Sequence, residues 1–135
     1  MIKLNKIVFC KDFGFETEDG EDEDVIHLTK SLNNRDIEYK DIEVIEGRPD
    51  FSKHCDLLVL DWGGMGCIGN NLFGCFVREL LEEAENRPNQ IFLIFSELTE
   101  WALSDIGKTI DDMPNNVFTD VSKLSEYFKE LKQDD

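Results

Sequence analysis

The residue types that could bind a ligand gather in one uncharged, glycine-rich stretch near the middle of the chain. An apolar run at residues 57–60 leads into Asp61 and Trp62, and five of the nine glycines lie between positions 63 and 74. A buried strand that opens into such a loop and then a helix exposes backbone N–H groups to a ligand. The sequence therefore predicts a small-ligand crevice here, with the ligand-binding candidates Asp12, Asp61, Trp62, Gly63, Gly64, Gly66, Gly69, Asn70 and Ser96.

Three of these glycines match a known spacing. Gly64, Gly66 and Gly69 fit the G-x-G-x-x-G pattern of dinucleotide-binding loops. In those proteins the loop follows the first strand, and an acid about twenty residues later binds the ribose. Here the loop follows the third expected strand, and the first acid after the next strand is Glu97. The spacing therefore disfavours a dinucleotide and leaves either a small-ligand loop or a tight turn that needs glycine.

The catalytic candidates are Asp61, Glu79 and Cys67. Two carboxylates on opposite sides of a sugar could perform glycosidic chemistry. A cysteine close to a helix N-terminus has a lowered pKa and becomes a better nucleophile. No histidine lies near Cys67 in the sequence, and these residues do not complete a catalytic constellation. The residues thus favour a binding or regulatory module over an enzyme, and they identify no cofactor.

Some of the same residues resemble the site of response-regulator receiver domains. Those domains phosphorylate an Asp after the central strand, with acids after the first strand, a Ser or Thr after the fourth and a Lys after the fifth. Asp12, Asp61 and Ser96 stand at similar intervals, so the resemblance implies a phosphoacceptor at Asp61. The sequence departs from the pattern at Lys11, where a magnesium-binding acid belongs, and at residues 119–123, which contain no Lys-Pro pair.

The chain is also similar to nucleoside deoxyribosyltransferase-like domains. They too place an Asp after a central strand, then a glycine loop, then a helix bearing a nucleophilic Glu. Glu79 is the only residue that could take that last role, and residues 116–128 are similar to the C-terminal strand and amphipathic helix of those domains. The resemblance implies an enzyme that processes a nucleotide or sugar through Asp61 and Glu79. The Glu-Leu-Gly type of motif is absent, because Leu80 and Leu81 follow Glu79.

The charge of the chain is strongly negative. Its net charge of −16 argues against binding nucleic acid through phosphate contacts and against anionic membrane surfaces. Seven acids and no base lie within residues 16–24. This run is typical of a solvated loop whose last acids enter the first turn of a helix, where the helix dipole stabilises them. A cation site and a surface that engages a basic protein partner are the alternatives.

The cysteines and histidines do not predict a metal site. The four cysteines form no C-x-x-C pair, and the two histidines are not at ligand spacing. No apolar run is long enough to span a bilayer. Four free thiols are typical of a reducing compartment, so we expect a cytoplasmic protein.

Strand and helix patterns alternate five times along a single domain of 135 residues. Strands are expected at 6–10, 37–45, 57–61, 90–95 and 117–119. Helices are expected at 22–33, in one short turn at 49–53, from Asn70 or Asn71 to about 86, from Ser96 or Thr99 to about 106, and from 121 onward. This alternation predicts a three-layer α/β sandwich of the flavodoxin-like type, with a mostly parallel sheet in the order 2-1-3-4-5 and a crevice between strands one and three. Spacing also predicts that Trp101 is buried.

Overall fold

Five parallel strands form one sheet in the order β2-β1-β3-β4-β5, as the sequence predicts. The computed structural model describes residues 1–11, 23–61, 67–96 and 99–133. The strands are β1 (Ile2–Lys11), β2 (Ile37–Glu46), β3 (Leu57–Asp61), β4 (Phe92–Ile94) and β5 (Val117–Phe118). The helices are α1 (Glu23–Asn33), α2 (Cys67–Asn86), α3 (Thr99–Asp105) and α4 (Val121–Gln133), with a 3₁₀ turn at Ile110–Asp112.

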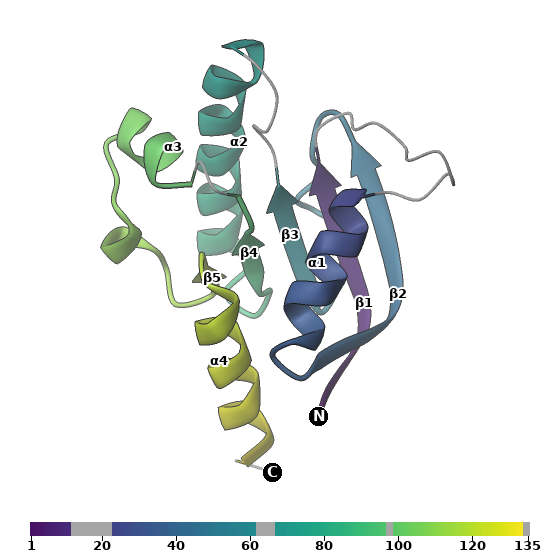
Figure 1. Cartoon of the computed structure of the whole chain (residues 1–135). Coiled ribbons are helices and arrows are strands. Elements are labelled where there is room, and N and C mark those ends of the chain that lie inside the picture. The colour runs from purple at the N-terminus through teal and green to yellow at the C-terminus, as the bar shows by residue number, and fades with distance from the viewer. Residues whose placement is uncertain (12–22, 62–66, 97–98, 134–135) are drawn as a thin grey trace.

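Helices cover both faces of this sheet, which makes a three-layer sandwich (Figure 1). On one face, α1 and α4 bury Leu28, Leu32, Leu124 and Phe128 against alternate strand residues. On the other face, α2 and α3 supply the buried residues Phe73, Phe76, Val77, Leu80, Leu81, Ala84, Ala102 and Leu103. The central strand β3 is apolar on both sides because both layers press on it, and residues 57–60 are fully buried.

The connection from β2 to β3 (residues 47–56, hereafter the β2–β3 connection) corrects one expectation. No helix forms at residues 49–53; the chain makes a turn at Phe51–Ser52 instead. Asp50 explains this, because its Oδ1 accepts hydrogen bonds from the Ser52 backbone N–H at 3.1 Å and from the Ser52 hydroxyl at 2.6 Å. Such a local side-chain bond competes with helix formation.

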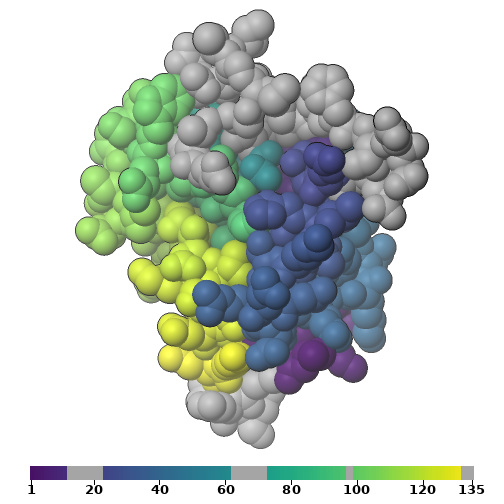
Figure 2. Space-filling model, in the orientation of Figure 1, coloured from purple at the N-terminus to yellow at the C-terminus, as the bar shows by residue number. Residues whose placement is uncertain are grey.

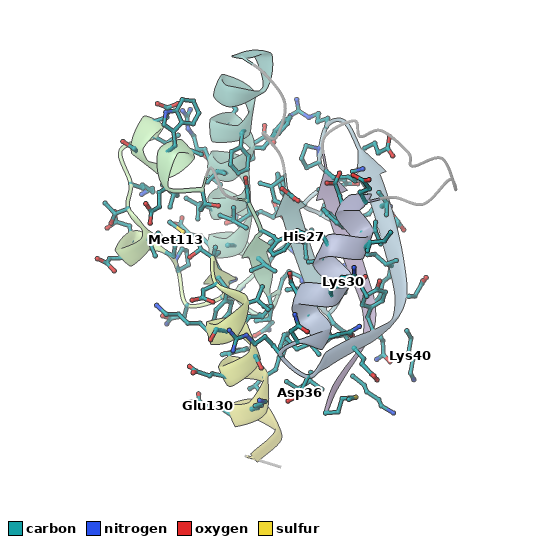
Figure 3. The ribbon with its side chains drawn as sticks, in the orientation of Figure 1. His27, Lys30, Asp36, Lys40, Met113 and Glu130 are labelled. Carbon is teal, nitrogen blue, oxygen red and sulfur yellow. The ribbon has the colours of Figure 1, made fainter. Side chains whose placement is uncertain are left out.

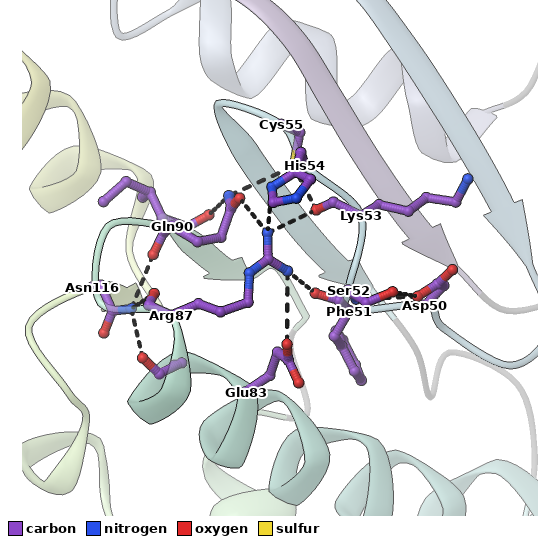
Figure 4. Close-up of polar contacts among 12 residues, drawn as sticks. Asp50, Phe51, Ser52, Lys53, His54, Cys55, Glu83, Arg87, Gln90 and Asn116 are labelled. Carbon is purple, nitrogen blue, oxygen red and sulfur yellow. Dashed lines mark hydrogen bonds and ion pairs between the residues drawn. The ribbon is translucent and has the colours of Figure 1, made fainter.

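Arg87, just beyond the end of α2, holds this irregular connection in place (Figure 4). Its guanidinium donates to the carbonyl of Phe51 and, at 3.2 Å, to that of Lys53. It also lies 3.4 Å from His54 Nδ1 and 3.3 Å from Gln90 Oε1. The guanidinium thereby supplies donors that a short helix would have provided internally.

Two further expectations differ from the structure. The helix α2 begins at Cys67, so Gly69 and Asn70 belong to it and neither Asn70 nor Asn71 precedes it as an N-cap. Gly and Asn have low intrinsic helix propensity, but their free-energy cost is small in the first turn of a helix, where packing against the rest of the protein readily outweighs it. Trp101 is 43% exposed, because α3 turns only Thr99, Ala102 and Leu103 inward.

Within the described residues, no helix is both long enough and apolar enough to cross a membrane.

Candidate functional site

A cavity of about 910 Å³ lies between α1 and α4, at the carboxyl ends of β3, β4 and β5 (hereafter the α1–α4 cavity). Figure 2 shows this face of the molecule, with α1 in dark blue beside α4 in yellow. Parallel strands bring their carboxyl ends to one edge, which is where ligands bind in open α/β sheets. The described lining consists of His27, Ser31, Asn34, Arg35, Asp61, Phe95, Ser96, Ile110, Thr119, Asp120, Val121, Ser122 and Lys123.

The strand ends supply the polar floor of this cavity. Asp61 is the last residue of β3, Ser96 lies two residues beyond β4, and Thr119 follows β5 directly. All three side chains are partly buried. The Ser96 carbonyl accepts a hydrogen bond of 2.7 Å from the Thr99 hydroxyl, which fixes the start of α3 beside the cavity. The sheet thus brings together Asp61 and Ser96, two residues that the sequence proposed for ligand binding.

The wall formed by α1 adds an aromatic surface. His27 projects from α1 toward β4 (Figure 3), and its ring centroid lies 5.3 Å from that of Phe95. The rings are tilted by 34°. His27 is exposed, whereas Phe95 is half-buried beneath it. This pair places aromatic, partly apolar surface next to the polar strand ends.

The opposite wall is the first turn of α4. Asp120 precedes this helix and caps it, because its Oδ1 accepts the Ser122 backbone N–H at 2.8 Å. Its carbonyl oxygen accepts the Leu124 N–H at 3.0 Å. An Asp at this position satisfies a free N–H and stabilises the helix dipole.

A buried cation lies beside Asp61 in the sheet. Lys11 ends β1 and is the register partner of Asp61 on β3. Its side chain is only 3% exposed, and Nζ pairs with Oδ2 of Asp24 at 3.0 Å. Glu23 and Asp24, the last acids of the acidic run, occupy the first turn of α1. The position where receiver domains carry a magnesium-binding acid is therefore occupied by an ammonium group paired to α1.

Glu79 lies in a different place from Asp61. It projects from α2, on the other face of the sheet, and pairs with Arg48 at 3.1 Å. It lines a second cavity of about 570 Å³, formed with the β2–β3 connection by Arg48, Pro49, Asp50, Phe51, Ser52, Glu82, Glu83 and Asn86. The structure does not bring Asp61 and Glu79 into one cavity, as joint work on a sugar would require.

The thiols that the structure describes are of two kinds. Burial raises the pKa of Cys10 to about 12, and it also raises the pKa of Cys55. Neither is therefore a thiolate at neutral pH. Cys75 is exposed on α2. Across the described residues, no three His, Cys, Asp or Glu side chains are grouped as a metal site.

Several predicted site residues lie outside what the structure describes. Asp12, Trp62, Gly63, Gly64 and Gly66 are not among the described residues. Cys67, Gly69 and Asn70 are placed in the first turn of α2 by their backbone alone.

Other residues of the α1–α4 cavity are ones that the sequence did not single out. The sequence around His27, Phe95 and Thr119 has the pattern of an ordinary helix or strand, and that pattern does not mark these residues as part of a site. The signal that could have found Phe95 and Thr119 is their position at the carboxyl ends of β4 and β5.

Comparison of the chain with protein-family models, with curated proteins and with solved structures gives no match. The functional assignment therefore rests on the geometry described above.

Proposed function

We propose that this protein is a binding module for a small ligand and that the α1–α4 cavity is its binding site. The observation that carries the proposal is the position of this cavity at the carboxyl ends of three adjacent parallel strands. Polar groups from separate strands converge there, and the aromatic pair of His27 and Phe95 lies beside them. A cavity of about 910 Å³ is within the size range of small-molecule sites.

Binding is favoured over catalysis by the placement of the two candidate carboxylates. Asp61 and Glu79 line separate cavities, one formed by α1 and α4 and the other by α2. A cytoplasmic setting belongs to this proposal, since Cys10, Cys55 and Cys75 are free thiols.

A thermal-shift screen tests the proposal. The set comprises monosaccharides, cyclitols, their phosphates, nucleosides, nucleotides and amino acids, each at millimolar concentration. Binding to the native state raises the melting temperature, and a ligand at one hundred times its Kd stabilises by about 2.7 kcal/mol. We expect a shift of several degrees from at least one compound.

Matched variants locate the binding site. Ser31→Phe places a ring in the cavity from α1, whereas Ser104→Phe places the same ring on exposed α3 outside it. The ligand-induced shift should disappear in the first variant and persist in the second. If no compound shifts the wild-type protein, or if the shift survives Ser31→Phe, the proposal fails.

A further inference from the structure

The formal charges around the α1–α4 cavity are balanced among the described lining residues. Arg35 and Lys123 are the cations, and Asp61 and Asp120 are the anions. One carboxylate stands at the sheet and the other at the start of α4. A phosphate monoester would carry one or two negative charges into a cavity bordered by both carboxylates, so the two cations are largely offset.

The amino terminus of α4 is the part of the wall where an anion would normally be stabilised most. First-turn N–H groups and the helix dipole favour negative charge there. In this protein the carboxylate of Asp120 already accepts the Ser122 N–H at 2.8 Å. A ligand phosphate would have to displace that carboxylate or lie next to it.

The remaining polar lining is suited to alcohol groups. The hydroxyl-bearing and amide-bearing residues are Ser31, Asn34, Ser96, Thr119 and Ser122. These side chains both donate and accept hydrogen bonds, as sugar hydroxyls do, and carboxylates accept from such hydroxyls. The rings of His27 and Phe95, which both line the cavity, supply aromatic surface for the C–H face of a saturated ring.

Building on the proposed function, we infer that the ligand is an uncharged, hydroxyl-rich ring compound, a monosaccharide or a cyclitol, and not its phosphate ester. Asp61 and Asp120 accept hydrogen bonds from its hydroxyls. Arg35 and Asn34 donate to its oxygens, and the aromatic pair packs on its less polar face.

Isothermal titration calorimetry on matched pairs tests this inference. The probes are D-ribose and ribose 5-phosphate, D-glucose and glucose 6-phosphate, and myo-inositol and its 1-phosphate. We expect the neutral member of the best-bound pair to bind at least about tenfold more tightly than its phosphate.

The variant Asp120→Asn identifies the cause of that preference. Asn is an equally good N-cap, so the helix start is retained while one negative charge is removed. We expect the preference for the neutral compound, measured as the ratio of the two affinities, to fall by about threefold to tenfold. The variant removes a negative charge that repels the phosphate and keeps a side-chain oxygen that accepts hydrogen bonds from hydroxyls. Asp41→Asn removes the same charge from an exposed position on β2 and should leave both affinities unchanged.

The outcomes separate this inference from the proposed function. Tighter binding of a phosphate ester, or a thermal shift only from amino acids or other compounds outside the sugar and cyclitol class, overturns the inference and leaves the proposed function standing. An absence of binding by every compound in both experiments overturns both. If Asp120→Asn prefers the neutral compound over its phosphate as strongly as the wild-type protein does, the repulsion between Asp120 and a phosphate is not the cause of that preference, and the inference fails.

Discussion

Replacing Asn116 with alanine tests how the end of α2 and the turn that follows it are held next to the start of β5. The side-chain amide of Asn116 donates to three carbonyl oxygens, those of Ala84 at 3.1 Å, Arg87 at 3.1 Å and Gln90 at 2.9 Å. Figure 4 shows these contacts around Asn116. The residue is only 8% exposed, so water cannot readily replace its side chain. One side chain therefore satisfies the carbonyl groups at the helix end and in the turn that leads to β4.

The expected cost follows from these contacts. Two amide protons serve three acceptors, which is equivalent to about two hydrogen bonds of roughly 1 kcal/mol each. A buried carbonyl left without a donor adds about 1–3 kcal/mol of desolvation, partly relieved by relaxation. We expect Asn116→Ala to lower the free energy of unfolding by about 2–4 kcal/mol.

Urea unfolding followed by far-ultraviolet circular dichroism measures this loss. Asn115→Ala is the matched control, because Asn115 is the exposed neighbour of Asn116, and it should change stability by less than about 0.5 kcal/mol. Asn116→Asp should be at least as destabilising as Asn116→Ala, since an ionised carboxylate cannot donate to carbonyl oxygens. A loss below about 1 kcal/mol, or equal losses in the two alanine variants, would refute the reasoning.

Two other predictions concern a buried thiol and an exposed indole. Burial raises the pKa of Cys10 from 9.0 to about 12, so between these values the unfolded chain releases the proton while the native protein retains it. The free energy of unfolding should therefore fall by about 1.4 kcal/mol per pH unit as the pH rises above 9. In urea titrations at several pH values, Cys10→Ala should reduce this dependence on pH. If the wild-type protein and Cys10→Ala lose stability equally with rising pH, the Cys10 thiol is not buried as described. Trp62→Phe leaves Trp101 as the single indole, which is 43% exposed. Its emission should lie close to that of tryptophan in water and be strongly quenched by acrylamide. A blue-shifted emission protected from acrylamide would contradict the exposure of Trp101.

The fold was predictable from the sequence wherever a local pattern has one structural solution. Residues 57–60 are apolar on both sides, and only a strand covered on both faces buries them all. The alternation along β2 indicates a half-exposed edge strand, which is its place in the sheet. Strand order then follows from short, right-handed crossovers between parallel strands.

The β2–β3 connection and α3 show where local patterns were insufficient. Proline at position 49 is compatible with a helix start, but the choice between helix and turn depended on the Asp50 carboxylate and on distant Arg87. For α3, the spacing of Trp101 identifies one side of a helix without showing which side is covered. The buried residues of α3 are Thr99, Ala102 and Leu103, and the last two belong to the core cluster that α2 forms with the sheet, so the smaller side chains are buried and Trp101 is not.

The candidate site was predictable in part for the same reason. Asp61 and Ser96 follow buried strands, and the edge at which parallel strands end is fixed by topology. The contribution of His27 depends on how α1 rotates over the sheet, and the pairing of its ring with Phe95 is a result of packing. The expected crevice between β1 and β3 is bordered by the buried Lys11, while the cavity itself extends toward β4 and β5.

The two cavities have different structural origins, and this difference supports placing the function at the first. The second cavity lies where the β2–β3 connection replaces a helix, and Phe51 together with the Arg48–Glu79 ion pair occupies part of that gap. A shortened crossover accounts for it without a ligand. The α1–α4 cavity lies between two fully formed helices, at the ends of strands that pair in continuous parallel register. Among the described residues, both helices that border this space are formed and polar groups from three strand ends line it, which supports a bound ligand as the better explanation for this cavity.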